Sequence, residues 1–198
     1  MKPCDPDPCG PDRKKARSLP EMVQLYIKCK RPKAQKELES FHKSPFEEAL
    51  GRAALAEHED GERLGHQRRL RPETLRRARN VLLDAAKELS ERDSFDALHD
   101  RVKELLNGIR GLGELYYYDT ALRVAGPARM PMRVYLHQGT REGARALGLD
   151  WHADSLDPRA LPRQLAVLEP HEMEDFLCIF KSRLTPKMGR PAQQRDDV

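Results

Sequence analysis

The chain has 198 residues, of which 38% are hydrophobic and 34% are charged, and its formal net charge is +4. This length suits one ordinary domain with a buried core, and no apolar run approaches the roughly 20 residues that a membrane-spanning helix needs. The N-terminus has no apolar stretch typical of a secretory signal, so we expect a cytoplasmic protein with no membrane partner.

The helical period organises most of the chain. Residues 1–17 are rich in Pro, Asp and Lys, lack an apolar period and are predicted to be a disordered leader. Residues 186–198 are predicted to be a disordered tail. Between them, residues 18–185 follow the helical period in nearly every segment. We therefore predict an all-α fold, a single compact domain of several helices, in which only "MRVYLH" (residues 132–137) hints at a strand.

Several predicted helices have recognisable ends. Ser44 is expected to cap a helix that opens with Pro45. One long helix is expected to run from Pro72 over "PETLRRARNVLLDAAKELSE". Ser94, or Asp93 before it, is expected to cap the next helix, and a glycine at position 108 is expected to end it.

The cysteine and histidine spacing predicts neither a metal nor another cofactor. The four cysteines contain no C-x-x-C pair. The segment "HEMED" (residues 171–175) places its His and acidic residues at helical spacing, where they do not converge on one ion. We find no P-loop and no hydrolase or metalloprotease motif.

Positive charge is unevenly distributed along the chain. Residues 1–36 carry ten Lys or Arg against four acids, and residues 66–79 carry six Arg against one Glu. Clusters of this kind are typical of proteins that bind a polyanion, although a charged helix face is also a common solvated surface. The residues that we expect at such an interface are Arg68, Arg69, Arg76 and Arg77.

Two glycines one residue apart lie between two helical patterns in "LLNGIRGLGELYYYDTALRVAG" (residues 105–126). Glycine tolerates positive φ and lets a ligand approach the backbone, and the first amides of the following helix carry the positive end of its dipole. A phosphate oxygen is a natural occupant of such a place. Gly111, Leu112 and Gly113 are therefore candidate phosphate-binding residues, and the alternative is a tight corner between helices.

The three tyrosines at 116–118 point in three directions of a helix, so at least one is expected at the surface. Tyr116 is our candidate for stacking on a base or donating to a phosphate. Asp119 is expected to pair with Arg123 one turn later.

The glycine-containing stretch, residues 105–125, resembles the helix-hairpin-helix motif of DNA-binding proteins. The resemblance lies in Leu106, Ile109, Gly111, Leu112, Gly113, Ala121 and Val124. It implies that backbone amides hold the sugar-phosphate backbone and read little base information.

The following segment, "MPMRVYLHQGTREGARALGL" (residues 130–149), is similar to the one that follows the hairpin in helix-hairpin-helix DNA glycosylases. Those enzymes carry a catalytic Asp there, and Tyr135 stands where we would place it. Tyr cannot replace a carboxylate at neutral pH, since its ordinary pKa is about 10. The resemblance therefore implies a glycosylase-like scaffold without that activity. The segment also looks like parts of bacterial proteins. That resemblance does not point to any particular function.

The same segment contains four further candidates for phosphate binding. Thr140 is expected to cap a helix, and Arg141 and Arg145 share one face of it. His137, just before them, is expected to contact phosphate or donate a proton.

Together these features predict a nucleic-acid-binding protein that holds the phosphate backbone without base specificity, with DNA as its partner and RNA as the alternative. Two other functions remain open. One is a protein-interaction or scaffold module whose basic leader docks on an acidic protein. The other is a divergent glycosylase-like enzyme that uses Asp119 or Asp150, although the missing Asp argues against enzymatic activity.

Overall fold

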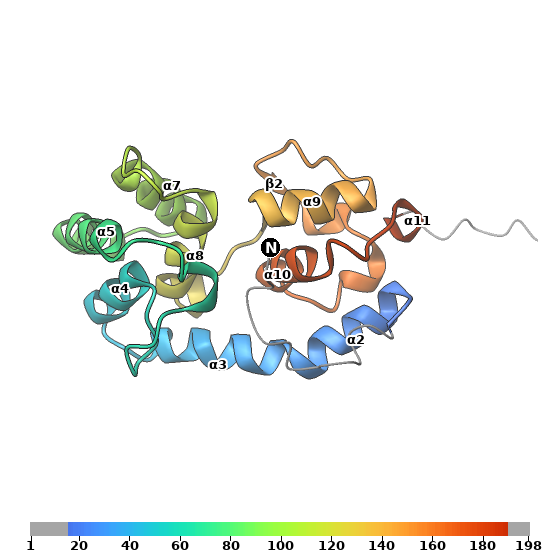
Figure 1. Cartoon of the computed structure of the whole chain (residues 1–198), viewed down its shortest axis with the longest axis horizontal. Helices are drawn as coiled ribbons and strands as arrows, with labels where there is room; N and C mark the ends of the chain where they lie inside the picture. The colour runs from blue at the N-terminus through green and yellow to red at the C-terminus, as the bar shows by residue number, and fades with distance from the viewer. Residues whose placement is uncertain (1–15, 190–198) are drawn as a thin grey trace, which may run out of the picture. The chain divides into compact units, whose positions relative to one another are not determined.

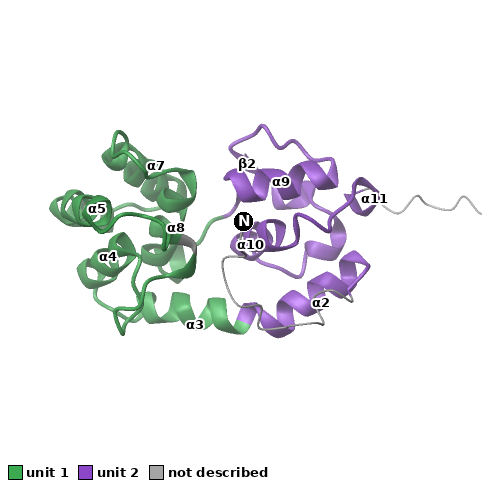
Figure 2. Ribbon diagram, viewed as in Figure 1, with its two compact units in different colours: residues 1–7, 32–131 green, residues 8–31, 132–198 purple. Residues whose placement is uncertain are grey.

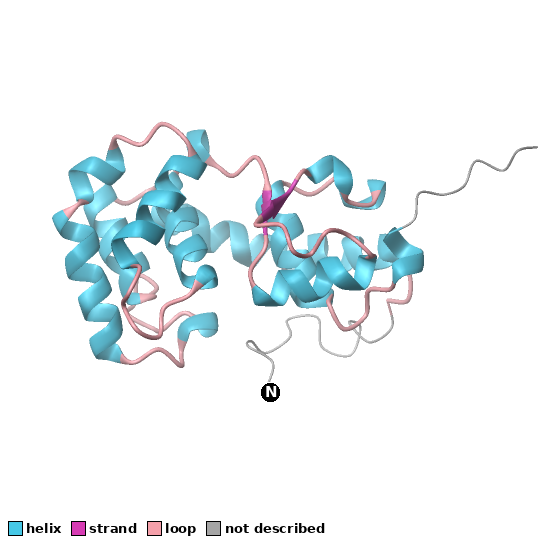
Figure 3. Ribbon diagram, turned by 90° about the horizontal axis from the view of Figure 1, so that it is seen from above, coloured by secondary structure: helices cyan, strands magenta, loops and turns pink. Residues whose placement is uncertain are grey.

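The computed structural model of the protein describes residues 16–189 (Figure 1). Helices joined by loops make up most of these residues, and the two short strands form one two-stranded sheet, which confirms the predicted all-α class (Figure 3). They form two compact units: unit 1 contains residues 32–131, and unit 2 contains residues 16–31 and 132–189 (Figure 2). Helical periodicity led us to expect one domain over residues 18–185. It does not reveal this division, because it does not say which helices share a core.

Unit 1 is a group of helices around an apolar core. Its elements are α3 (Arg31–His42, whose first residue belongs to unit 2), α4 (Phe46–Leu55), η1 (Gly65–Gln67), α5 (Pro72–Asp84), α6 (Ala86–Ser90), α7 (Phe95–Leu106), α8 (Glu114–Ala125) and η2 (Pro127–Arg129). Helix α4 packs on α5 and α8, and α7 packs on α8 and α5. Helix α8 is therefore covered by two neighbours.

Local sequence signals locate some helix ends and miss others. Ser94 caps α7 as expected, with its hydroxyl accepting the Ala97 N–H at 3.3 Å. Ser44 does not cap α4: its hydroxyl donates to the Ser40 carbonyl, and Pro45 is the extended residue before the helix. The long helix predicted from Pro72 is interrupted at Ala85, where no Gly or Pro marks the break.

Unit 2 combines segments that are far apart in the chain. Its elements are α2 (Leu19–Cys29), β1 (Val134–Tyr135), α9 (Gln138–Leu147), β2 (Ser155–Leu156), η3 (Pro158–Ala160), η4 (Arg163–Leu165), α10 (Pro170–Phe180) and α11 (Pro186–Gly189). Strands β1 and β2 are antiparallel, which confirms the short strand expected within residues 132–137. Helix α10 packs on α9, α2 and β1.

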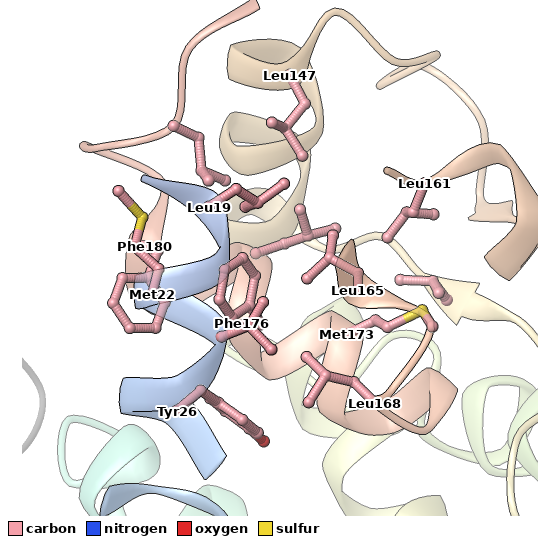
Figure 4. Packing of buried hydrophobic residues seen from close by; sticks show 14 of the residues in the cluster. Leu19, Met22, Tyr26, Leu147, Leu161, Leu165, Leu168, Met173, Phe176 and Phe180 are labelled. Atoms are coloured by element: carbon pink, nitrogen blue, oxygen red, sulfur yellow. The ribbon is translucent and has the colours of Figure 1, made fainter. Parts of the chain in front are cut away.

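The core of unit 2 joins α2 to α10 (Figure 4). Tyr26 of α2 meets Phe176 of α10 edge-on with ring centroids 6.1 Å apart, and Phe180 lies 4.7 Å beyond Phe176. Leu19 and Met22 present the same face of α2 to this cluster. Burial of side chains this large is the main source of stability in such a core.

The ordered structure reaches further at both ends than we expected. Ala16, assigned to the leader, is buried in the core of unit 2. Residues 186–189, assigned to the tail, form α11, and Gly189 packs directly on Leu147 of α9. The remainder of the predicted leader and tail, 1–15 and 190–198, lies outside the described residues.

Between residues 16 and 189, no helix combines the length and the apolar character needed to cross a membrane.

Candidate nucleic-acid interface

The glycine turn, residues 107–113, connects α7 to α8 in unit 1. Gly108 has φ +90° and ends α7 as expected, and the buried Ile109 anchors the segment. The Leu112 N–H donates to the Ile109 carbonyl at 3.2 Å. With Gly111 at φ +100°, these residues form a type II β-turn, whose third position favours glycine. The backbone conformation alone therefore explains Gly111.

Gly113 is different, because neither conformation nor packing requires it. It is the N-cap of α8, with φ −151° and ψ −176°, which any residue can adopt. A Cβ at this position would meet no atom of the described part of the chain within 4 Å. Within residues 16–189, the backbone N–H groups of Gly113 and Leu115 have no hydrogen-bond acceptor. The start of α8 thus presents unpaired donors in open space, the arrangement that suits an anion.

Arg110 is a residue that sequence reasoning missed. It is the second residue of the type II turn, between Ile109 and Gly111, and its side chain is exposed. Its position inside the hairpin motif could have identified it as a candidate from the sequence. Glu114, the first residue of α8, is also exposed and places a negative charge at the same helix end.

The expectation that a tyrosine reaches the surface is wrong. All three are buried, and Tyr116 is 3% exposed. Its hydroxyl donates to the Ala54 carbonyl of α4 at 2.6 Å, and burial raises the pKa of the phenol. Tyr118 meets Phe95 of α7 at a centroid distance of 5.7 Å. Because α8 packs on both α4 and α7, Tyr116 has no free face for a nucleic acid.

The predicted pairing of Asp119 with Arg123 is confirmed, with 3.6 Å between the guanidinium and the carboxylate. Asp119 also accepts a 2.8 Å hydrogen bond from the side chain of Gln67. Asp150, the other carboxylate considered for catalysis, is exposed in unit 2 and accepts the His152 N–H. Asp119 therefore has a structural role, and the contacts of Asp150 are confined to its own loop.

Two of the candidate arginines, Arg68 and Arg69, directly follow η1, the short helix that contacts α8. The Gln67–Asp119 bond holds η1 against the second turn of α8, and Arg63 lies close enough to Tyr116 for its charge to favour the ionised phenol. Arg68 and Arg69 follow directly and are exposed. A shallow depression of about 560 Å³ is lined by Glu62, Arg63, Arg68, Leu70 and Pro72.

Arg76 and Arg77 are exposed on α5, so they add positive charge to the surface of the unit that contains the glycine turn. Arg79, on the same helix, is half-buried, with its guanidinium beside Gly51 of α4.

The candidates at 137–145 belong to unit 2, and only one of them is a surface cation. His137 and Thr140 are 5% and 0% exposed, so the expectation that they contact phosphate is wrong. His137, and not Thr140, is the N-cap of α9, because its Nδ1 accepts the Gly139 N–H while the Thr140 hydroxyl accepts the His137 N–H.

The two arginines of α9 have different environments. Arg141 donates to three carbonyls, those of residues 151–153, at 2.7–3.2 Å, and so holds the following loop. Arg145 is exposed, with its guanidinium 5.8 Å from the centre of the Trp151 ring. Only Arg145 remains available to a polyanion.

Tyr135, at the position of the glycosylase Asp, is half-buried in β1. Among the residues that the structure describes, no group of three or more His, Cys, Asp or Glu is placed to hold a metal ion.

Comparison with protein-family models, with curated proteins and with solved structures found no match to this chain.

Proposed function

We propose that the protein binds DNA through the glycine turn, with one phosphate held at the N-terminus of α8 and no reading of base sequence. The observation that carries this proposal is the open space at Gly113. Gly is a weaker N-cap than Asn, Asp or Ser, and none of the residues that the structure describes crowds this position. Approach of an external phosphate to the amides of Gly113 and Leu115 would explain why a glycine occupies this position.

Positive charge on unit 1 supports the same function. Arg110 is exposed on the turn itself, and Arg68 and Arg69 are exposed next to the segment that contacts α8. Contacts of arginines with phosphate release counterions, so affinity should fall steeply with salt. We propose DNA as the preferred partner, together with a cytoplasmic location in a bacterial cell.

The proposal is tested by comparing Gly113→Asp with Gly113→Asn. Both residues are good N-caps, so both variants should fold and keep α8. Aspartate puts a negative charge where the phosphate would bind, whereas asparagine has nearly the same shape without the charge. The measurement is fluorescence anisotropy of a labelled 20-base-pair duplex at 50 and 200 mM salt, with a single-stranded RNA of mixed sequence as a second probe.

We expect Gly113→Asp to weaken duplex binding at least about tenfold more than Gly113→Asn does. Equal affinities for the two variants would show that the turn binds no phosphate, and absence of wild-type binding at 50 mM salt would reject the function altogether. Tighter binding of RNA than of the duplex would reject DNA as the preferred partner.

A further inference from the structure

Five exposed arginines lie around the start of α5 in unit 1, and we call them the α5 arginine cluster. They are Arg68, Arg69, Arg71, Arg76 and Arg77. Within residues 16–189, none of their side chains forms an ion pair, a hydrogen bond or a ring contact. Each of these guanidinium groups is therefore available to a ligand.

Other arginines of unit 1 hold the fold through their side chains. Arg123 of α8 pairs with Glu37 of α3 at 3.2 Å, and Arg101 of α7 pairs with Glu88 of α6 at 2.8 Å. The α5 arginine cluster makes no contact of this kind. Its like charges repel one another and add nothing to the packing of unit 1, so a polyanion that neutralises them is the partner that fits.

The acids near the cluster do not cancel its charge. Residues 66–79 hold six Arg and one acid, Glu73, which gives them a net charge of +5. The preceding loop, residues 57–63, carries four acids, of which Glu57 pairs with Arg63 at 3.7 Å and Glu59 pairs with Arg52 at 3.9 Å. The remaining acids of the loop are Asp60 and Glu62. Positive charge therefore dominates around the start of α5.

The residue type points to phosphate. The cluster consists of arginine alone, and no lysine occurs between residues 44 and 86. A guanidinium presents a planar pair of N–H donors that matches two phosphate oxygens, whereas an ammonium acts as a point charge. Phosphate groups are therefore the anions that this surface recognises best.

We propose that the α5 arginine cluster is a second contact for the phosphate backbone of DNA, separate from the glycine turn. This inference rests on the proposed binding of DNA and extends it to a longer site. The hydrogen bond from Gln67 to Asp119 fixes the segment before the cluster beside the second turn of α8, about 9 Å along the helix axis from Gly113. From Arg71 to Arg77 the cluster extends about 9 Å along α5, which matches about three phosphates of one strand.

The test neutralises two members of the cluster in the full chain. Arg76→Gln combined with Arg77→Gln removes two charges from α5. The matched control is Arg159→Gln combined with Arg163→Gln, which removes two charges from exposed arginines of unit 2. Affinity for the labelled 20-base-pair duplex is measured at several salt concentrations from 50 to 200 mM, and the melting temperature of each variant is recorded.

We expect the cluster variant to bind at least about tenfold more weakly at 50 mM salt, because two phosphate contacts are lost. The slope of log affinity against log salt should become shallower by about 2, since each lost contact releases about one counterion fewer. The control should change the affinity less than about threefold. The melting temperature of the cluster variant should not fall, because the replaced side chains have no partner in the described part of the chain.

Lysine replacements separate phosphate recognition from simple attraction to charge. Arg76→Lys combined with Arg77→Lys should keep the salt slope and bind about threefold more weakly, because an ammonium loses the bidentate contact. Full affinity of this variant would overturn recognition of phosphate by the guanidinium groups.

An equal loss in the cluster variant and in the control would overturn this inference, and so would an unchanged salt slope. Comparison with Gly113→Asp separates the two proposals. A loss in Gly113→Asp alone would reject the cluster and leave the glycine turn, and a loss in the cluster variant alone would do the reverse. Absence of wild-type binding at 50 mM salt would reject both.

Discussion

Arg31 and Glu172 form a bidentate ion pair although 141 residues separate them in the chain. Arg31 Nε donates to Oε1 at 2.6 Å, and Nη2 donates to Oε2 at 2.7 Å. The Glu172 carboxylate is buried and also accepts the Glu169 N–H at the start of α10. One carboxylate thus caps α10 and ties it to the chain segment that follows α2.

Replacing Arg31 by Met should destabilise unit 2 by about 3 kcal/mol, because a buried carboxylate loses its partner. Arg31→Lys keeps the charge but loses the bidentate geometry, and should destabilise unit 2 by about 1 kcal/mol. The measurement is urea unfolding followed by the fluorescence of Trp151, the one tryptophan of the chain, which lies in unit 2. Equal costs for the two variants would show that the geometry of the pair contributes nothing.

Alanine should have opposite effects at two glycines that both lie inside helices. At Gly51 of α4 a Cβ meets only the Arg79 side chain, at 3.5 Å, so Gly51→Ala should stabilise unit 1 by about 0.5–1 kcal/mol. At Gly143 of α9 a Cβ would lie 2.9 Å from the Leu177 carbonyl carbon and closer still to its oxygen. Gly143→Ala should therefore destabilise unit 2 by about 2 kcal/mol or more.

Thermal unfolding by circular dichroism checks both changes, with Trp151 fluorescence to identify the transition of unit 2. A stable Gly143→Ala protein would mean that α9 can move away from α10 at little cost.

Removing the negative charge of Glu114 should strengthen duplex binding about two- to fivefold, because this carboxylate competes with a phosphate for the same helix end. Glu47→Gln is the matched control, since Glu47 is also exposed in the first turn of a helix, α4, and changes the net charge equally. Anisotropy titrations at 50 mM salt measure both. The same gain in both variants would indicate a general charge effect with no role for the glycine turn.

The stability of unit 1 should fall as the pH drops below about 6.5. Burial lowers the pKa of His99, against the opposing influence of Asp100, so the unfolded chain binds a proton at a higher pH than the folded protein does. The dependence should not exceed about 1.4 kcal/mol per pH unit for one histidine. Urea unfolding at pH 7.5 and 5.0 should show a smaller difference in His99→Gln than in the wild type. His152→Gln, which changes an exposed histidine of unit 2, should leave that difference as it is.

Features governed by neighbouring residues were predictable from the sequence. The Ser94 cap, the helix end at Gly108 and the pairing of Asp119 with Arg123 each depend on residues within one or two turns. The position of Gly111 in a tight turn follows in the same way from its local pattern.

Features that depend on which helices meet were not predictable. Tyr116 is buried because α8 packs on α4 as well as on α7. The helical period of α8 does not reveal that a second helix covers it. The misassigned cap of α9 has a chemical cause: an imidazole nitrogen takes the place of the expected hydroxyl, and Thr140 occupies the third position of the helix.

The division of the chain also sets an order of folding during synthesis. Residues 32–131 of unit 1 are continuous, so a growing chain can complete that core as soon as α8 has left the ribosome. Helix α2 is made earlier, yet Phe176, which packs against Tyr26, is more than a hundred residues later in the chain. The apolar face of α2 must therefore remain without the cover that α10 gives it until α10 has been synthesised.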